Sequence, residues 1–455
     1  MRTVRHSQIL IHSGRVIDAA SGRDEIVDMA VTDGLIARQA HAGACVVDAS
    51  GLIVCPGMVD LHVHLREPGE THKETIETGT AAAAAGGFTL VACMPNTSPP
   101  MDSPDIVRFV LQRAGESAHC DVAPVGAITR GRAGRELTDF AAMVEAGAVA
   151  FSDDGYGVED DAVMLAAFEQ AAKLNALLIQ HCEYKSISAG GVMHLGDVSR
   201  RLGLPGLDPR SEEAMIERDL DLCRRTGGRY HVAHISTARA VELVRQAKRE
   251  GLPVTAEVCP HHLCLTDAAC ADDDVNTKMH PPLRPARDVE ACQHGLLEGT
   301  IDCIATDHAP HTNEEKRAGF LDAPPGIVGL ETAVGVTALV MVCSGLTDWP
   351  DLVSWFTSAP AAVLGHPRSM GTQRPEDPAN TTITSELGRI EPGRVANLTL
   401  LDPHSRWVVD PERFESKCCN TPFAGNELTG RAVATIRGHV VKLHAGTPPN
   451  LIPPE

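Results

Sequence analysis

The sequence predicts an α/β fold: a (β/α)8 barrel with a small β-domain assembled from both ends of the chain. The chain has 455 residues, which is too long for one ordinary domain but fits one barrel plus a smaller companion. In its middle part, short apolar runs alternate with helical stretches, as in barrels. Both ends instead show the two-residue alternation that is typical of half-buried strands.

The two ends are predicted to form a single β-domain. Residues 1–57 contain short alternating segments separated by glycine turns, and residues 387–443 return to the same pattern. Each part is small for an independent sheet, so we expect the two to pair with each other. The predicted divisions are therefore 1–57, a barrel at 58–366, and 367–455, which holds a polar, proline-rich surface insert at 367–386 and the second part of the β-domain.

The barrel prediction depends on eight apolar runs with helical material between them. Typical helical stretches are Thr75–Ala85, Asp160–Leu174, Glu212–Arg225 and Thr237–Glu250. The eight predicted strands are Met58–Leu65, Phe88–Met94, Asp121–Ile128, Ala148–Ser152, Ala176–His181, Arg229–Ile235, Pro253–Val258 and Ile301–Thr306.

Polar residues that can bind a metal follow these predicted strands. Residues two apart on a strand point to one face, so His62 and His64 can aim both imidazoles at one cation. An isolated His-x-His is about as often a pair of hydrogen-bonded core histidines. The other strand ends add His181, His234, Asp154 and Asp307, and in a barrel all these ends meet at one mouth, where barrel enzymes place their chemistry.

Four histidines and two aspartates form a nitrogen and oxygen set that suits zinc. They are too many for one tetrahedral ion but fit two ions that share a carboxylate. Metal binding lowers the pKa of water from about 15.7 to about 7, which supplies a hydroxide nucleophile at neutral pH. Asp307 is placed to accept its proton and pass it to a leaving nitrogen. Spacing alone does not decide whether Asp153 or Asp154 is the shared carboxylate. We expect His261 and His262 to contact and orient the ligands without binding the metal themselves.

A second group at the same mouth suits an anionic, planar ligand. Arg66 offers a two-pronged donor, and Asn96 and His311 offer single donors. Each has an ordinary alternative, since Asn96 can cap a turn and Arg66 can pair with a neighbouring glutamate. Residues 312–324 follow the last strand end and are a candidate lid over the mouth.

Composition narrows the class of protein. A formal net charge of −20 argues against nucleic acids and anionic membrane surfaces as partners. No apolar run reaches eighteen residues, and the first residues lack the apolar centre of a signal peptide. The 14 scattered cysteines are typical of reduced core residues, so we expect a cytoplasmic protein.

Several motifs resemble those of class I dihydroorotases, a family of the amidohydrolase superfamily. The resemblance runs through nearly the whole predicted barrel and into the last strands. It is carried by DLHVHLREPGETHKE (60–74), GGFTLVACMPNT (86–97), AFSDDG (150–155), QHCE (180–183), HVAHIST (231–237), EVCPHHLCLTD (257–267), KMHPPLR (278–284), DHAPHT (307–312), GIVGLETAV (326–334) and the closing KCCNTPFAGNELTGRAVATIRG.

This resemblance implies a distorted barrel beside a β-sandwich made from both termini, and a zinc site with two ions per subunit. It implies an aspartate, Asp154, where hydantoinases place a carboxylated lysine, and Asp307 as both ligand and general acid/base. The resemblance also implies substrate contacts from Arg66, Asn96, His311, His280 and the backbone at Pro325 and Gly326. His280 is a departure, because the family often has asparagine at that position.

The expected activity is reversible cyclisation of N-carbamoyl-L-aspartate to L-dihydroorotate in pyrimidine synthesis. One alternative is another cyclic amidohydrolase, such as an allantoinase or hydantoinase. A different class of alternative is a non-catalytic subunit of aspartate transcarbamoylase, because the family includes members that work in such complexes. We expect a homodimer, with a transcarbamoylase complex as a further partner.

Overall fold

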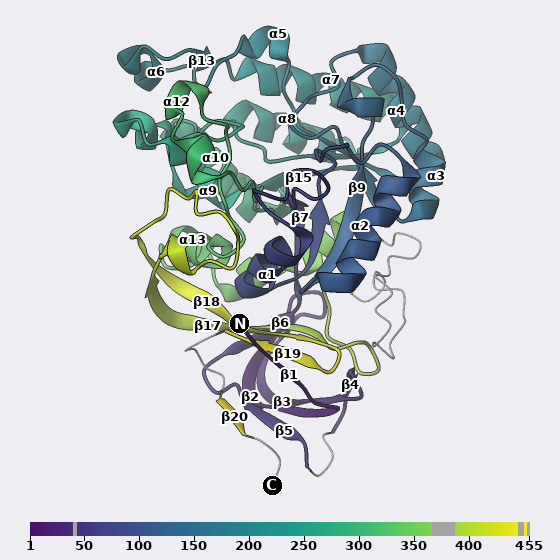
Figure 1. Ribbon diagram of the computed structural model, residues 1–455, viewed down its shortest axis with the longest axis vertical. Coiled ribbons are helices and arrows are strands. Elements are labelled where there is room, and N and C mark those ends of the chain that lie inside the picture. The colour runs from purple at the N-terminus through teal and green to yellow at the C-terminus, as the bar shows by residue number, and fades with distance from the viewer. Residues whose placement is uncertain (40–42, 366–386, 445–449, 453–455) are drawn as a thin grey trace.

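The structure is a computed structural model that describes residues 1–39, 43–365, 387–444 and 450–452. It consists of a barrel and, below it in Figure 1, a β-domain in which purple strands from the N-terminal end lie beside yellow strands from the C-terminal end. The predicted insert at 367–386 lies outside the described residues. No helix in the described ranges is long and apolar enough to cross a lipid bilayer.

The barrel is one sheet of eight parallel strands in chain order. All eight apolar runs are confirmed as strands, with ends shifted by a few residues. They are β7 (Met58–Val63), β8 (Phe88–Cys93), β9 (Asp121–Gly126), β10 (Ala150–Phe151), β11 (Leu177–Gln180), β14 (Arg229–Val232), β15 (Val254–Val258) and β16 (Cys303–Ile304). The first and last strands are not paired along their length in the described chain; beyond β16, Val63 bridges His308, His64 N donates to His308 O at 2.9 Å and the Asp60 carboxylate accepts Thr306 N at 3.2 Å. The barrel is therefore distorted, and its closing contact lies at the mouth.

Helices cover the barrel, and several begin where the sequence predicts. Thr75, Asp160 and Thr237 cap α1, α4 and α8 by accepting backbone N–H groups with their side chains. The longer helices are α1 (Ile76–Gly86), α2 (Pro104–Ser117), α3 (Phe140–Ala146), α4 (Asp161–Leu174), α7 (Arg210–Thr226), α8 (Ala238–Arg249), α10 (Ala286–Leu297), α14 (Trp349–Phe356) and α15 (Ser358–Leu364).

The connections at the mouth carry short elements that the sequence did not predict. A long excursion after β11 contains a two-stranded sheet, β12 with β13, and further short helices follow β15 and β16. These elements are η1 (Arg130–Arg132), α5 (Lys185–Ser188), β12 (Met193–His194), α6 (Asp197–Leu202), β13 (Gly206–Leu207), α9 (Pro260–Cys264), η2 (Asp267–Asp272), η3 (Val275–Thr277), α11 (Asn313–Lys316) and α12 (Gly319–Asp322). The short helices α13 (Ala333–Thr337) and η4 (Ala338–Val342) follow and pack against β18 of the β-domain.

The β-domain is a ten-stranded sheet built from both ends of the chain, as predicted. Its centre is the antiparallel pairing of β6 with β17, in which Cys55 lies opposite Thr399. Strands from both ends enclose one buried cluster that includes Ile11, Val54, Leu398 and Ile436, which makes the sheet a sandwich. The strands are β1 (Arg2–Arg5), β2 (Gln8–Asp18), β3 (Arg23–Thr32), β4 (Leu35–Ala37), β5 (Cys45–Asp48), β6 (Ile53–Pro56), β17 (Asn397–Val408), β18 (Glu427–Arg437), β19 (Val440–Leu443) and β20 (Asn450–Ile452).

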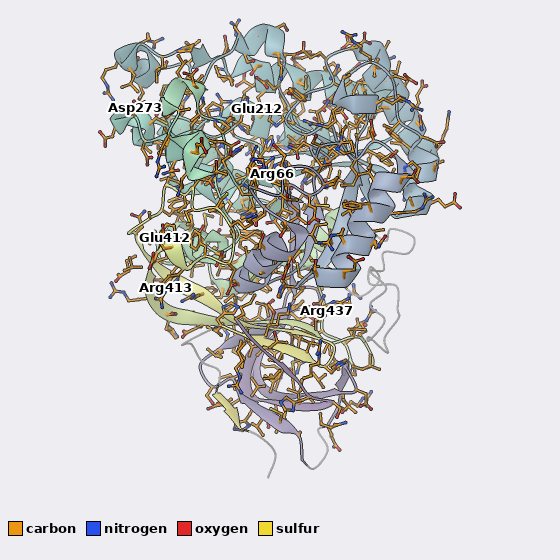
Figure 2. The ribbon with its side chains drawn as sticks, viewed as in Figure 1. Arg66, Glu212, Asp273, Glu412, Arg413 and Arg437 are labelled. Atoms are coloured by element: carbon orange, nitrogen blue, oxygen red, sulfur yellow. The ribbon has the colours of Figure 1, made fainter. Side chains whose placement is uncertain are left out.

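Specific contacts attach the sandwich to the end of the barrel opposite the mouth. Thr399 Oγ1 donates to Gly87 O at 2.6 Å, and Arg437, labelled in Figure 2, pairs with Asp121 at 2.7 Å. Gly87 has φ +98°, and a Cβ there would lie 2.9 Å from side-chain carbons of Thr399 and Ala432. Only glycine therefore lets the two parts approach this closely.

Candidate metal and active site

All six predicted metal-binding residues lie together at the mouth of the barrel. His62 and His64 come from the end of one strand, and each of the other four comes from the end of a different strand. Their side chains are buried, which is unusual for so many titratable groups in one place. His62 lies on β7, with His64 just beyond that strand. The other four follow β10, β11, β14 and β16; they are Asp154, His181, His234 and Asp307.

Asp154 lies at the centre of this group. Its Oδ1 atom is 3.1 Å from His62 Nε2, 3.7 Å from His181 Nδ1 and 3.8 Å from His234 Nε2. Its Oδ2 atom is 3.6 Å from His64 Nε2. Burial alone would raise the pKa of Asp154, but the surrounding histidines hold it well below its usual value. A carboxylate with both oxygens among four imidazoles is placed to bridge two cations.

Asp153 faces away from this centre. Its carboxylate accepts the backbone N–H of Thr129 at 3.0 Å and the hydroxyl of the same residue. Burial raises the pKa of Asp153 to about 6. The geometry therefore separates the two adjacent aspartates, which spacing alone left open, and assigns Asp153 to holding the loop after β9.

Asp307 approaches the same two histidine nitrogens as Asp154. Its Oδ1 atom is 2.9 Å from His64 Nε2 and 3.6 Å from His62 Nε2. Although burial alone would raise the pKa of Asp307, these imidazoles hold it below its usual value, so the group is an ionised carboxylate. Asp307, His234 and Arg66 all have positive φ (47°, 32° and 57°), a strained backbone for these residue types that is concentrated here.

The histidines fit a cation. His62 Nε2 is buried and makes no hydrogen bond, and His181 Nδ1 faces His234 Nε2 at 2.9 Å. Burial would lower the pKa of His62, yet the nearby carboxylates raise it well above its usual value. The same negative surroundings that favour a proton on this nitrogen favour a metal ion there.

A buried carboxylate that the sequence reasoning left without a role orients His62. Glu257, on β15, accepts from His62 Nδ1 at 2.8 Å and lies 3.1 Å from His231 Nε2. Burial opposes its charge, but the two histidines lower the pKa of Glu257 to about 2. The signal was present in the sequence, because a single acidic residue inside the apolar run VTAEV needs a buried partner.

The predicted anion-binding residues lie at the same mouth. Arg66 Nη2 donates to His311 Nε2 at 3.3 Å, while Arg66 Nε and His311 Nδ1 are buried without a hydrogen-bond partner. Burial and the charge of Arg66 lower the pKa of His311 to about 2, which keeps its imidazole neutral. Figure 2 shows Arg66 in the body of the molecule. Two unsatisfied buried donors side by side suit a carboxylate.

Asn96 contacts the metal-binding residues directly. Its Oδ1 atom accepts from His64 Nδ1 at 2.7 Å, and its Nδ2 donates to Asp154 Oδ2 at 3.3 Å. The side chain therefore contacts the metal-binding residues instead of capping a turn, which was the alternative. Asn96 therefore fixes the orientation of His64 and retains one N–H for a ligand.

His280 lies at the edge of the group and is part-exposed. Its Nε2 atom is 3.3 Å from Glu183 Oε1, and the other oxygen of Glu183 is 3.7 Å from His181 Nε2. Glu183 had no predicted role, although it stands in the QHCE motif. His262 Nε2 donates to Pro281 O at 3.0 Å and so holds the loop that carries His280, in keeping with a supporting role.

Two buried lysines hold the candidate lid at 312–324: Lys316 bonds within the segment, and Lys278 joins the segment to a neighbouring loop. Lys316 Nζ donates to Pro324 O at 3.0 Å, and Lys278 Nζ donates to Leu321 O at 2.9 Å. Gly326, just after this segment, donates its N–H to Lys278 O at 2.9 Å. Pro325 and Gly326 are thereby placed next to His311, and movement of the segment stays a prediction.

Comparison with known proteins identifies the family. A family described as "Dihydro-orotase-like" matches residues 51–240. A protein named dihydroorotase from Pelotomaculum thermopropionicum is 50% identical over 435 residues, which cover 95% of this chain and 97% of that protein. Another from Elusimicrobium minutum is 44% identical over 442 residues, covering 96% and 98%.

Solved structures with the same architecture are cyclic amide hydrolases. The L-hydantoinase (dihydropyrimidinase) from Arthrobacter aurescens matches with a TM-score of 0.82 and 25% identity, covering 96% of both chains. Dihydropyrimidinase from Brevibacillus agri matches with a TM-score of 0.79, 20% identity and coverage of 96% and 95%. From its identity to the dihydroorotases over nearly its whole length, this chain belongs to the dihydroorotase family of amidohydrolases.

Proposed function

We propose that the protein is a zinc-dependent dihydroorotase that interconverts N-carbamoyl-L-aspartate and L-dihydroorotate in pyrimidine synthesis. The observation that carries this proposal is that six residues able to bind cations lie at one mouth with the unsatisfied donors of Arg66 and His311. Asp307 and Asp154 act electrostatically on the Arg66 guanidinium, so the two halves of the site are close together. Dihydroorotate has the matching chemistry, a ring carbonyl and a carboxylate on one small ring.

Two metal ions fit the donor set. His62, His64 and Asp307 would hold one ion, His181 and His234 the other, with Asp154 shared between them. Imidazole and carboxylate ligands are those that zinc prefers. Bound there, zinc would lower the pKa of a coordinated water and polarise the ring carbonyl.

The residues of the chain supply orientation and proton transfer. Arg66, Asn96 and His311 hold the substrate carboxylate, with His280 and the backbone at Pro325 and Gly326 against the ring. In ring opening, Asp307 takes the proton of the attacking water and delivers it to the amide nitrogen as the C–N bond breaks. The new carboxylic acid then loses a proton to solvent. Ring closure therefore consumes one proton, and lower pH favours dihydroorotate.

The direct test is ring opening of L-dihydroorotate by the zinc-loaded wild type, followed in the ultraviolet and compared with allantoin and hydantoin. We expect turnover of dihydroorotate and a much smaller rate with the other two, which lack the ring carboxylate that Arg66 and His311 would bind. Turnover of hydantoin or allantoin alone would refute the substrate assignment. Metal-loaded protein that opens none of the three rings would refute the enzymatic proposal and favour a subunit role.

We also propose a cytoplasmic homodimer that can associate with aspartate transcarbamoylase. All fourteen cysteines lie in described ranges and are free thiols, which supports a reducing compartment. Sedimentation of the protein alone and with the transcarbamoylase tests both assemblies, and a monomer that does not shift with the partner contradicts them.

Replacing Glu257 with glutamine is expected to weaken metal binding by about 10–100-fold, because the neutral amide no longer enhances the basicity of His62. Glutamine keeps the shape and one of the two acceptor oxygens, so the barrel should still fold. The measurement is the metal retained after dialysis against increasing chelator. Glu242→Gln, an exposed partner of Arg245 on α8, is the control. Identical release curves for Glu257→Gln and wild type would contradict the role.

A further inference from the structure

The loop between β17 and β18, residues 409–426, extends from the sandwich to the barrel mouth. In Figure 1 it is the yellow loop that runs beside α13 and α9, and Figure 2 labels Glu412 and Arg413 near its outer edge. It contains the short helix η6 (Pro411–Arg413) and the KCCNTPF stretch of the closing motif. Nothing in the proposed chemistry uses this loop.

One residue of the 409–426 loop, Asn420, is inserted between two turns at the mouth. Its side-chain Nδ2 donates to Ala309 O at 3.1 Å and to Gly326 O at 3.0 Å. Its Oδ1 accepts the backbone N–H of His311 at 3.1 Å. Both amide hydrogens and the amide oxygen are thus used, and the residue is 2% exposed.

The backbone of Asn420 adds a fourth link, because Val328 N donates to its carbonyl oxygen at 2.9 Å. The residue therefore joins the turn that follows β16, which carries His311, to the segment that carries Gly326. These two segments are closely packed: a Cβ at Gly326 would lie 2.7 Å from Ala309 Cβ and 3.4 Å from His311 Cδ2. A displacement of one turn therefore moves the other.

A second link from the same loop reinforces this arrangement. Ser416 Oγ donates to Glu74, whose Oε2 atom lies 3.4 Å from His308 Nε2, and His308 Nδ1 accepts the N–H of Gly329 at 3.2 Å. His308 follows Asp307 and makes the closing contact of the barrel. The loop thus holds the segment that follows β16 at two points, His308 and His311. Among the described residues, no hydrogen bond or ion pair joins the loop to the six metal-binding residues.

We propose that Asn420 is a positioning residue for the substrate carboxylate, acting through the backbone of His311 and Gly326. The inference rests on the proposed function, because it assigns the residue to the carboxylate end of that site. An amide is needed at this position, since only an amide offers two donors to the two carbonyls and one acceptor to the His311 N–H. Loss of Asn420 displaces His311 from Arg66 and leaves the metal end in place.

The test is steady-state ring opening of L-dihydroorotate by zinc-loaded Asn420→Ala and Asn420→Asp, with metal content measured on the same samples. The aspartate variant keeps the size and the acceptor but replaces both donors with a carboxylate that faces two carbonyls. Thr399→Val is the control, because it also removes buried hydrogen bonds at a sandwich–barrel contact, those with Gly87 O and Met58 N, but at the far end of the barrel. We expect KM to rise about tenfold or more in both Asn420 variants, with kcat within about threefold and metal content unchanged.

The control separates positioning from general stability, because Thr399→Val should keep the wild-type KM. If the alanine variant does not fold, the aspartate variant alone decides. An unchanged KM in an active, folded Asn420 variant overturns the inference, as does an equal rise in Thr399→Val. Loss of metal parallel to loss of activity also overturns it, since Asn420 would then support the metal end. Metal-loaded wild type without activity on dihydroorotate refutes the proposed function, and the inference with it.

Discussion

The Asp307→Asn variant is expected to lose about 10²–10⁴-fold in kcat for ring opening while it keeps most of its metal. Asparagine preserves the size of the side chain and an oxygen toward His64 Nε2, which lies 2.9 Å from Oδ1 in the structure. It cannot accept the proton of the attacking water, so only the proton-transfer contribution to catalysis is removed. The measurement is the ultraviolet rate together with metal analysis of the same protein.

Asp302→Asn provides a matched control for this variant. Asp302 lies just before the same strand, β16, at the end opposite the mouth, where it pairs with Lys248 at 2.7 Å and accepts Ala256 N at 2.8 Å. The control should keep the wild-type kcat even if stability falls. A kcat for Asp307→Asn within about tenfold of wild type, with metal bound, would show that another group carries the proton. Metal loss that accounts for the whole rate change would assign Asp307 to ligation alone.

Removal of metal by a strong chelator is expected to reduce activity below about 1% and to lower the melting temperature, with both recovered on addition of zinc. Activity falls because no water in the site then has a pKa near 7. Stability falls because a ligand that binds only the folded state contributes RT ln(1 + [L]/Kd), about 4 kcal/mol at a thousandfold excess over Kd. Melting curves with and without zinc, read beside the activity, measure both effects.

Magnesium is the control ion for this experiment. It prefers oxygen ligands and octahedral geometry, whereas the site supplies four imidazoles and two carboxylates. Magnesium should therefore restore neither the rate nor the melting temperature at concentrations where zinc restores both. Full activity at less than about a tenth of an ion per chain would contradict a metal-dependent reaction.

The sequence predicts most of the fold because the barrel repeats a simple pattern. Each strand is a short apolar run, and Thr75, Asp160 and Thr237 cap helices from positions where such residues are favoured. The convergence of the metal-binding residues follows from the same logic, since ligands at the ends of parallel strands of one barrel must meet at its mouth. Spacing alone does not separate Asp153 from Asp154, because the difference depends on the hydrogen bonds that Asp153 accepts from Thr129 in another loop.

The residues that sequence reasoning missed act through contacts between distant segments. Glu257 orients His62 from β15, which lies two strands away from β7 across the closing contact of the barrel. Asn420 reaches Gly326 from 94 positions along the chain. Neither contact has a periodic signature, because each depends on how loops from separate elements meet in space. Glu257 could have been noticed, because it is an isolated acidic residue in an apolar strand. The residues around Asn420 have no pattern that predicts its contacts.

The pairing of β6 with β17 has a consequence for how the protein is made in the cell. At this junction Met58 N meets Thr399 Oγ1, two residues 341 positions apart in the chain. A ribosome adds about 5–20 residues per second, so strands from the N-terminal end wait roughly 20–70 s for their partner to be synthesised. During this interval β6 presents unpaired backbone groups along an apolar edge, which is a template for association with other chains. The yield of active protein should therefore depend on the speed of translation and on chaperones, more than on the stability of the finished fold.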